Sequence, residues 1–360
     1  MTRLGDVCAI RYGKDHKKLS DGSVPTYGSG GIMRYVDTAI CEQPSVLIPR
    51  KGTLGNLFYT DEPFWTVDTL FWTDIDQTKI VPKYLYYQLK QKDLASYNVG
   101  TAVPSLTVEV LNEIDLDVPS IDKQRRIVEV LNSFDSKIAL NNQLNDYLEQ
   151  LVDGKFQELF GGLNFNATLS DVAEITMGQS PAGSSYNEEG AGIIFYQGRG
   201  EFGWRFPKRR LYTTEPKRLA CEGDVLMSVR APVGDLNVAF ENCCIGRGLA
   251  AIHSETPSFA LYLMRFLKPQ LEAYNGEGTV FGSINGKALK SLEVALPSHN
   301  EVMQFESFAA PIDALIRSNE NETRKLNNLR NYLLPKLMSG EIDVSKVDLT
   351  QLTNNHLADC

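Results

Sequence analysis

The stretch "DVPSIDKQRRIVEVLNSFDSKI" at residues 117–138 returns as "ALPSHNEVMQFESFAAPIDALI" at residues 295–316, and this repetition decides the fold. The second copy lies 178 positions after the first. The same offset relates Tyr84-Leu85 to Tyr262-Leu263 and Gly100-Thr101 to Gly278-Thr279. Nearer the start the offset is 165, because Leu4, Asp6, Val7, Ile10 and Gly13 match Leu169, Asp171, Val172, Ile175 and Gly178. A duplication of this length predicts pseudo-twofold architecture, and duplex DNA is a common partner with matching symmetry.

Each copy ends in a long amphipathic segment. From Asp122 to about Phe160 the chain has no proline, and its apolar residues fall mostly three or four positions apart, which predicts a helix about 60 Å long. A second such helix is expected to end at Pro335. The apolar residues form a narrow stripe along each helix, which favours an antiparallel two-helix coiled coil. Asn141-Asn142 and Asn319, which interrupt the two stripes, are expected to set its register. The alternative is two amphipathic helices that each lie on their own globule.

The parts before the helices read as short strands broken by turns. The segments 44–56, "PSVLIPRKGTLGN", and 223–235, "GDVLMSVRAPVGD", each place an apolar strand before a basic turn. Residues 81–90 and 259–268 have the spacing of short helices. We therefore expect an α+β fold with two pseudo-symmetric globules and two long helices. The expected boundaries are 1–118 and 162–296 for the globules, 119–161 and 297–342 for the helices, and 343–360 for a tail.

The charge is unevenly distributed along the chain. The net charge is −9, yet residues 1–60 hold eight basic and five acidic residues, and residues 195–250 hold nine and six. Residues 107–160 hold five basic and eleven acidic residues. The acidic residues are therefore concentrated on the helices and the basic residues on the globules. The chain shows neither a signal peptide nor an apolar run long enough for a membrane span, which predicts a cytoplasmic protein.

Several segments resemble motifs of enzymes or nucleotide-binding proteins, but their neighbouring residues do not fit those motifs. Gly198, Gly200 and Gly203 have dinucleotide-fingerprint spacing, but the following residues 204–207, "WRFP", cannot open the required helix. Residues 282–288, "GSINGKA", are one position short of a phosphate-binding loop and lack its Ser or Thr. The four histidines are scattered, and the six cysteines form no C-x-x-C pair. We expect no catalytic residue, no metal and no cofactor.

Matched loops in the two copies carry basic residues among Tyr, Gln, Ser and Gly. Such side chains reach base edges and phosphates, and glycine lets backbone amides approach phosphates. The candidates in the first copy are Lys14, Lys17, Lys18, Tyr27, Ser29, Arg34, Arg50, Lys51 and Thr53. The candidates in the second copy are Gln179, Ser180, Gln197, Arg199, Arg205, Lys208, Arg209, Arg210, Arg230 and Arg247. The run 208–210 favours phosphate contact, whereas Arg50 and Arg230, which each follow an apolar strand, are better candidates for base contact.

At these residues the chain resembles the specificity subunit of type I restriction–modification enzymes. The resemblance covers nearly the whole length and rests on the order and duplication of several segments. These segments are "YGSGG" (27–31), "VLIPRKGTLG" (46–55), "FWTVDTLF" (64–71), "VPSIDKQRRIVEVL" (118–131), "LMSVRAPVGDLN" (226–237), "CCIGRGLAAI" (243–252), "GTVFGSING" (278–286), "LPSHNEVMQF" (296–305) and "LRNYLLPKLMSGEIDV" (329–344).

The resemblance implies two target-recognition domains, one for each half of a split DNA site. It also implies a helical spacer that docks two modification subunits, which carry the methyl donor, and a restriction subunit that joins them to cleave. The chain itself would be non-enzymatic. Two alternatives stay open: a protein–protein adaptor without DNA contact, and a stand-alone enzyme such as a DNA methyltransferase or nucleotide hydrolase.

Overall fold

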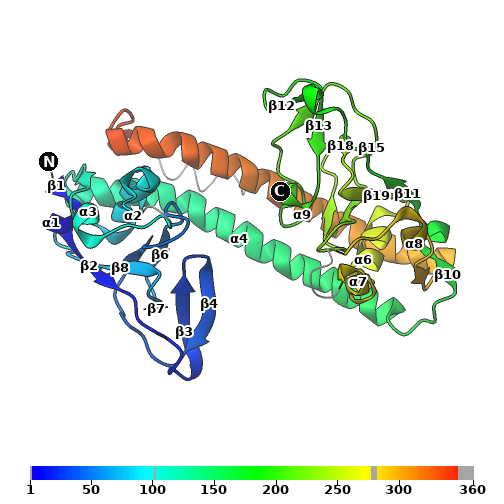
Figure 1. The fold of residues 1–360 in the computed structure, drawn as a ribbon, viewed down its shortest axis with the longest axis horizontal. Helices are drawn as coiled ribbons and strands as arrows, with labels where there is room; N and C mark the ends of the chain where they lie inside the picture. The colour runs from blue at the N-terminus through cyan, green and yellow to red at the C-terminus, as the bar shows by residue number, and fades with distance from the viewer. Residues whose placement is uncertain (1, 101–102, 277–281, 348–360) are drawn as a thin grey trace. The chain divides into compact units, whose positions relative to one another are not determined.

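The structure is a computed structural model that describes residues 2–100, 103–276 and 282–347 (Figure 1). Thr101, Gly278 and Thr279, which belong to the matched loops, and the tail from residue 348 lie outside the described residues. The chain divides into two compact units. Unit 1 contains Met1–Leu140 and Glu322–Cys360, and unit 2 contains Asn141–Asn321. The long helices α4 (Ile121–Phe160) and α9 (His299–Ser339) each contribute one part to either unit.

Unit 1 is built on a four-stranded sheet of order β2-β8-β5-β6. A second sheet has the order β4-β3-β7, and β1 pairs with β9. The strands are β1 (Thr2–Arg3), β2 (Cys8–Tyr12), β3 (Asp21–Gly28), β4 (Gly31–Val36), β5 (Ser45–Pro49), β6 (Phe58–Thr60), β7 (Trp65–Thr66), β8 (Leu70–Ile75) and β9 (Asp115–Leu116). The helices confined to this unit are α1 (Leu4–Val7), α2 (Pro82–Lys90) and α3 (Val108–Asn112).

Unit 2 repeats this plan with a four-stranded sheet of order β11-β19-β16-β17. A five-stranded sheet has the order β12-β14-β13-β18-β15, and β10 pairs with β20. The strands are β10 (Ala167–Thr168), β11 (Glu174–Met177), β12 (Tyr186–Asn187), β13 (Ile193–Tyr196), β14 (Tyr212–Thr213), β15 (Leu219–Ala220), β16 (Val225–Ser228), β17 (Leu236–Val238), β18 (Cys243–Ile245), β19 (Leu249–His253) and β20 (Glu293–Val294). The helices are α5 (Leu169–Val172), α6 (Pro257–Phe266), α7 (Lys268–Glu272) and α8 (Gly286–Lys290).

The strand registers confirm the duplication and locate its insertion. Leu47 pairs with Trp72 in unit 1 and Leu226 with Ala251 in unit 2, so the offset at these sheets is 179. Tyr27 pairs in parallel with Thr66, and Tyr196 pairs in parallel with Ile245. The two tyrosines are therefore only 169 positions apart, whereas Thr66 and Ile245 are 179 apart. Most of the extra residues of the second copy therefore lie between Tyr196 and β16, in the segment that carries the basic run 208–210.

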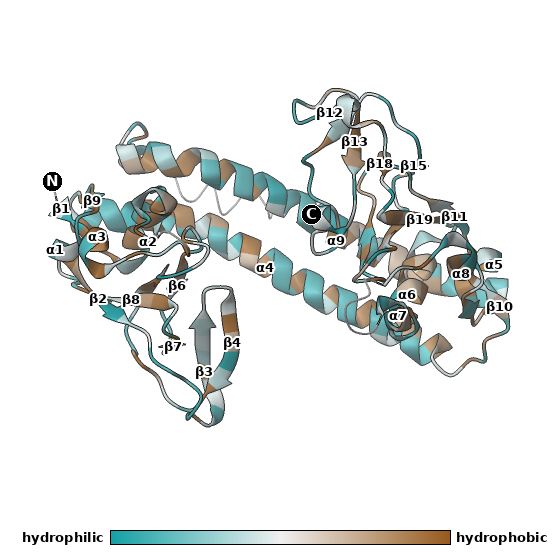
Figure 2. Ribbon diagram, viewed as in Figure 1, coloured by the Kyte–Doolittle hydropathy of each residue, from teal (hydrophilic) through white to brown (hydrophobic). Residues whose placement is uncertain are grey.

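The long helices pack against each other within each unit with antiparallel pairing. In unit 1, Asp135 of α4 contacts Arg330 of α9 at 2.6 Å, and in unit 2 the Asn319 amide donates to Asn145 at 2.8 Å. Asn141 and Asn319 are buried, and Asn141 Nδ2 donates to the Asn319 carbonyl at 3.5 Å. Figure 2 shows the alternation of apolar and polar bands along both helices. The antiparallel coiled coil is thus confirmed, and the register role of the asparagines remains a prediction.

The expectation that Pro335 ends the second helix is wrong. α9 continues to Ser339 and ends at Gly340, whose φ of +78° is left-handed. Proline removes one helical hydrogen bond, but the buried side chains of Leu334, Leu337 and Met338 continue the apolar stripe into the unit 1 core. Their burial offsets the lost bond.

The short helices α2 and α6, both expected from the sequence, join each sheet to the long helices. α2 packs Tyr84 and Leu85 into the unit 1 core with Ile127 of α4. α6 packs Phe259 against Phe156 and Phe305, with ring centroids 5.7 and 6.2 Å apart. The loops at the far ends of each sheet are thereby held on a rigid base. Among the described residues, none of the helices combines the length and the apolarity that a membrane crossing requires.

Candidate nucleic-acid interface

In unit 2, five candidate residues gather where β11, β13 and β16 end and β19 begins. Backbone bonds join these ends: Gln179 donates to Ile245 at 3.0 Å, Gly246 to Tyr196 at 2.8 Å, and Val229 to Gly248 at 2.9 Å. The Ser180 hydroxyl accepts from the Arg247 amide at 3.3 Å. We call this cluster the unit 2 edge; its members are Gln179, Ser180, Gln197, Arg230 and Arg247.

The same bonds recur at the corresponding place in unit 1. Lys14 donates to Thr66 at 2.8 Å, Val67 to Tyr27 at 3.0 Å, and Arg50 to Thr69 at 2.9 Å. We call this cluster the unit 1 edge; its members are Lys14, Tyr27, Arg50 and Lys51. The duplicated backbone thus presents two equivalent sets of side chains.

A glycine in each unit makes the close approach at the edge possible. A Cβ at Gly13 would lie 2.0 Å from the Val67 carbonyl oxygen, and one at Gly178 would lie 2.2 Å from that of Gly246. No other residue fits in either place, because contacts this short require backbone movement. The matched glycines of the sequence repeat therefore fix the geometry of both edges.

The structure corrects the equivalence of the two strand-end arginines. Lys51 forms an isolated antiparallel bridge with Ser105, and Arg230 forms one with Ser283. Lys51 therefore corresponds to Arg230, and Arg50 corresponds to Val229. The Arg50 side chain instead contacts other residues of unit 1. It donates to the Asp68 carbonyl at 3.2 Å, and its guanidinium carbon lies over the Tyr12 ring, 5.2 Å from the ring centroid.

Three exposed candidate arginines of unit 2 are paired with acids. Arg199 contacts Asp235, Arg209 contacts Glu241 at 2.5 Å, and Arg210 contacts Glu201 at 2.8 Å. These pairs also place the arginines: Asp235 precedes β17 and Glu241 follows it, so Arg199 and Arg209 lie at opposite ends of this strand. The structure thus brings Arg199 toward the unit 2 edge and leaves the run 208–210 apart from it.

The side chains of several other candidate cations form no salt bridge within the described part of the chain. They are exposed or half-buried, so their positive charge is available to an anionic ligand. These residues are Lys14, Lys17, Lys18, Arg50, Lys51, Lys208, Arg230 and Arg247.

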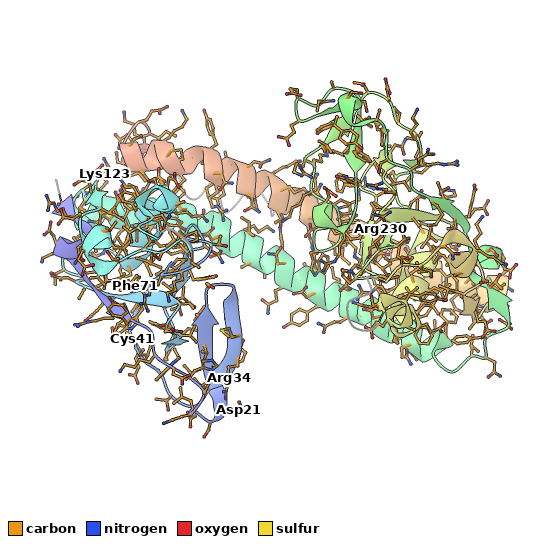
Figure 3. All side chains as sticks on the ribbon, viewed as in Figure 1. Asp21, Arg34, Cys41, Phe71, Lys123 and Arg230 are labelled. Carbon is orange, nitrogen blue, oxygen red and sulfur yellow. The ribbon has the colours of Figure 1, made fainter. Side chains whose placement is uncertain are left out.

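The remaining unit 1 candidates lie on the β3–β4 hairpin and the turns beside it. Arg34 of β4 contacts Asp21 at 2.6 Å and also donates to the Leu19 carbonyl (Figure 3). The Ser29 carbonyl at the hairpin tip accepts from the Asn56 side chain at 2.7 Å. This bond ties the tip to the turn that carries Lys51 and Thr53.

Arg205 does not fit its expected role as a DNA contact. Its side chain is 4% exposed, and its guanidinium lies 3.0 Å from Glu149 of α4 and 3.0 Å from Asp313 of α9. It also donates to the Tyr262 hydroxyl at 3.2 Å. Burial alone would lower the pKa of Arg205, but Tyr262, Asp313 and Glu149 outweigh burial and raise it. Arg205 is therefore a charged anchor that joins its loop to the long helices within unit 2.

One group of metal-ligand side chains comes together among the described residues. Ligand atoms of Cys221, Asp224 and His253 lie within 4.8 Å of one another. His253 Nδ1 is 2.6 Å from Asp224 Oδ1, and the Cys221 amide donates to Asp224 Oδ2 at 2.7 Å. These hydrogen bonds hold Asp224 between His253 and the backbone of Cys221.

Sequence reasoning missed a set of cations in the segment first considered as a phosphate-binding loop. Lys287 and Lys290 of α8 line a hollow in unit 2 together with Arg218. The lysines of "GKALK" (286–290) were visible in the sequence, but their meeting with Arg218 depends on the pairing of β15 with β18.

Comparison with known proteins defines the class. The profile of the family described as "Type I restriction modification DNA specificity domain" matches residues 1–150 and again 166–331. The chain belongs to this family of type I restriction–modification specificity proteins.

Its relatives include two archaeal proteins from Methanocaldococcus jannaschii. The type I restriction enzyme MjaX specificity subunit is 34% identical over 298 residues, which cover 75% of this chain and 70% of the relative. The MjaIX specificity subunit is 23% identical over 348 residues, which cover 84% and 78%. A crystal structure of the S subunit of a type I restriction–modification system from M. genitalium has a TM-score of 0.63 at 16% identity, covering 93% of this chain and 95% of that one. This last similarity concerns the fold.

Proposed function

We propose that this chain is the non-catalytic DNA-reading subunit of a type I restriction–modification complex and that it recognises a bipartite target. Residues 1–118 and 162–296 form the two recognition domains, and the long helices form the spacer. The observation that carries this proposal is the equivalent construction of the two edges on duplicated hydrogen bonds. Lysine, arginine and glutamine at such loops are the side chains that read base edges and hold phosphates.

The two edges carry different side chains on the same backbone. Lys14 in unit 1 corresponds to Gln179 in unit 2, and Lys51 corresponds to Arg230. Asp68 corresponds to Arg247. Asp68 follows Val67, whose amide donates to Tyr27, and Arg247 follows Gly246, whose amide donates to the equivalent Tyr196. Different donors and acceptors select different bases, so the two halves of the target have different sequences.

Exposed apolar side chains on the long helices support a scaffolding role. Leu151 of α4 in unit 2 is 54% exposed, and Leu329 of α9, at the equivalent place in unit 1, is 43% exposed. Tyr147 of α4 and Tyr332 of α9 are also exposed, at places that the repeat does not match. Apolar residues in equivalent exposed places suit two copies of one partner, as two modification subunits would be.

The test is sequence selection by the assembled complex. The chain is purified together with its modification subunits and incubated with a library of random duplexes, and the bound fraction is sequenced. We expect two short conserved blocks separated by a spacer of fixed length. Bound duplexes without any enriched sequence would contradict the proposal and favour the adaptor alternative.

A calorimetric titration of the chain alone with S-adenosylmethionine tests the alternative that the chain is itself a methyltransferase. The methyl donor belongs to the modification subunit under this proposal, so we expect no saturable heat. Saturable binding to the chain alone would favour a stand-alone methyltransferase.

A further inference from the structure

A basic hollow lies beside the unit 2 edge and plays no part in the function proposed so far. Its volume is about 780 Å³, and it follows β11, the outermost strand of its sheet. Three exposed cations line it, Arg218, Lys287 and Lys290, and one acid, Glu174. We call these three cations with the space between them the basic hollow.

The cations of the basic hollow keep their charge for a ligand. None of the three forms an ion pair within the part of unit 2 that the structure describes, unlike Arg199, Arg209 and Arg210 nearby in the sequence. Glu174 is the single acid in the lining, so the hollow carries an excess of two positive charges. Such an excess on a chain of net charge −9 attracts a polyanion locally.

The segment that leads into α8 is bridged to Arg230. Ser283 bridges Arg230, Ile284 donates to the Val229 carbonyl at 3.1 Å, and α8 begins two residues later. Asn285 caps α8 by accepting from the Ala288 amide at 3.0 Å. A Cβ at Gly286 would lie 2.9 Å from Met177 Cγ, so α8 packs closely on the end of β11. The backbone on either side of the hollow therefore leads to two members of the unit 2 edge, Gln179 after β11 and Arg230 opposite Ser283.

Unit 1 has the same scaffold without the charges. α3 corresponds to α8, and its cap Thr107 accepts from the Val110 amide as Asn285 does from Ala288. The places of Lys287 and Lys290 are taken by Glu109 and Asn112. Arg218 corresponds to Ala39, because the bridge of Cys41 with Phe64 repeats the pairing of Ala220 with Cys243.

We infer that the basic hollow binds the sugar–phosphate backbone of the duplex whose bases the unit 2 edge reads, and that the equivalent place in unit 1 makes no such contact. This inference rests on the proposed function. Unpaired lysine and arginine beside a base-reading edge act as phosphate contacts, which strengthen binding without selecting sequence. The basic hollow thus adds to the salt dependence with which the unit 2 half of the target is bound.

The experiment measures binding of the chain, assembled with its modification subunits, to its own target duplex over a range of salt concentrations. The variant Arg218→Gln/Lys287→Gln/Lys290→Gln is compared with the unaltered protein. We expect the slope of log affinity against log salt to become shallower by about one for each cation removed, and the selected sequence to stay the same. An unchanged slope would overturn the inference.

Two controls separate charge from folding and from the proposed function. Arg218→Lys/Lys287→Arg/Lys290→Arg keeps the charges, and Glu109→Gln alters the equivalent place in unit 1; both should retain the original slope. A shallower slope with the charge-keeping variant would contradict the phosphate assignment. If the unaltered complex selects a sequence while the glutamine variant keeps its slope, only the basic hollow fails; if the unaltered complex selects none, the proposed function fails.

Discussion

Asp135 of α4 and Asp313 of α9 occupy equivalent places in the two units, and each accepts hydrogen bonds from one tyrosine and one arginine. The arginine on Asp135 is Arg330, which comes from the neighbouring long helix. The arginine on Asp313 is Arg205, which comes from the loop that the second copy inserted after Tyr196. The second unit thus uses its helix pair to hold a recognition-domain loop.

Arg205→Ala is expected to lower the free energy of unfolding by about 3–5 kcal/mol, because it leaves Asp313 without its buried cation and Glu149 with Arg265 alone. Arg209→Ala, on the same loop, removes an exposed pair with Glu241 and should cost less than about 1 kcal/mol. Urea denaturation of the full chain, followed by circular dichroism, measures both. Equal losses for the two variants would contradict the anchor role.

Paired and unpaired arginines should differ in their effect on the salt dependence of DNA binding. Arg247→Gln removes an unpaired cation from the unit 2 edge and should make the slope shallower by about one. Arg209→Gln should change the slope little, because Glu241 already neutralises this guanidinium. Salt titrations of the assembled complex compare them. A larger change for Arg209→Gln would mean that its ion pair opens on the duplex.

His253 should make stability depend on pH. Its hydrogen bond and charge interaction with Asp224 raise the pKa of His253 above its ordinary value of 6.5. The folded state therefore binds the proton more tightly, so this stabilisation is complete below the unfolded pKa and disappears as pH rises through the folded pKa. Unfolding measured from about pH 6 to about pH 9 should show that His253→Gln is less stable than the original chain at the lower end and similar at the upper end. A difference that grows with pH would show the opposite sign of coupling.

The long helices should set the spacing of the two half-sites. A seven-residue insertion after Leu140 in α4 and another after Asn321 in α9 add about 10 Å to each helix and nearly keep its facing. The selected spacer should then lengthen by about three base pairs, with both half-site sequences unchanged. The duplex-library selection reads this directly. An unchanged spacer would exclude the ruler role.

The elements were predictable from the sequence because their signals are local. The stripe of α4, the strand–turn segments at 44–56 and 223–235, and the short helices α2 and α6 all follow from the spacing of apolar residues. Pro335 was misjudged because the packing that carries α9 past it comes from other parts of unit 1.

The side-chain roles were harder to predict because they depend on distant partners. Arg205 looks like an exposed loop cation, and its acids lie 56 and 108 positions away. The acids that pair with Arg199 and Arg209 lie 36 and 32 positions away. The match of Lys51 to Arg230 was hidden because the offset is 179 at the sheets and 178 at the helices, a difference that only strand register reveals.

The most direct test of the two-reader account is to sequence the methylated positions in cells that carry the complete system with Lys51→Ala or with Arg230→Ala. Each side chain occupies the same place on its own edge, so each substitution should relax bases in one half-site and leave the other half and the spacer intact. Loss of a base contact should cost about 1–3 kcal/mol of discrimination at the affected position. If both substitutions relax the same half-site, the units do not read the target separately and the account is wrong.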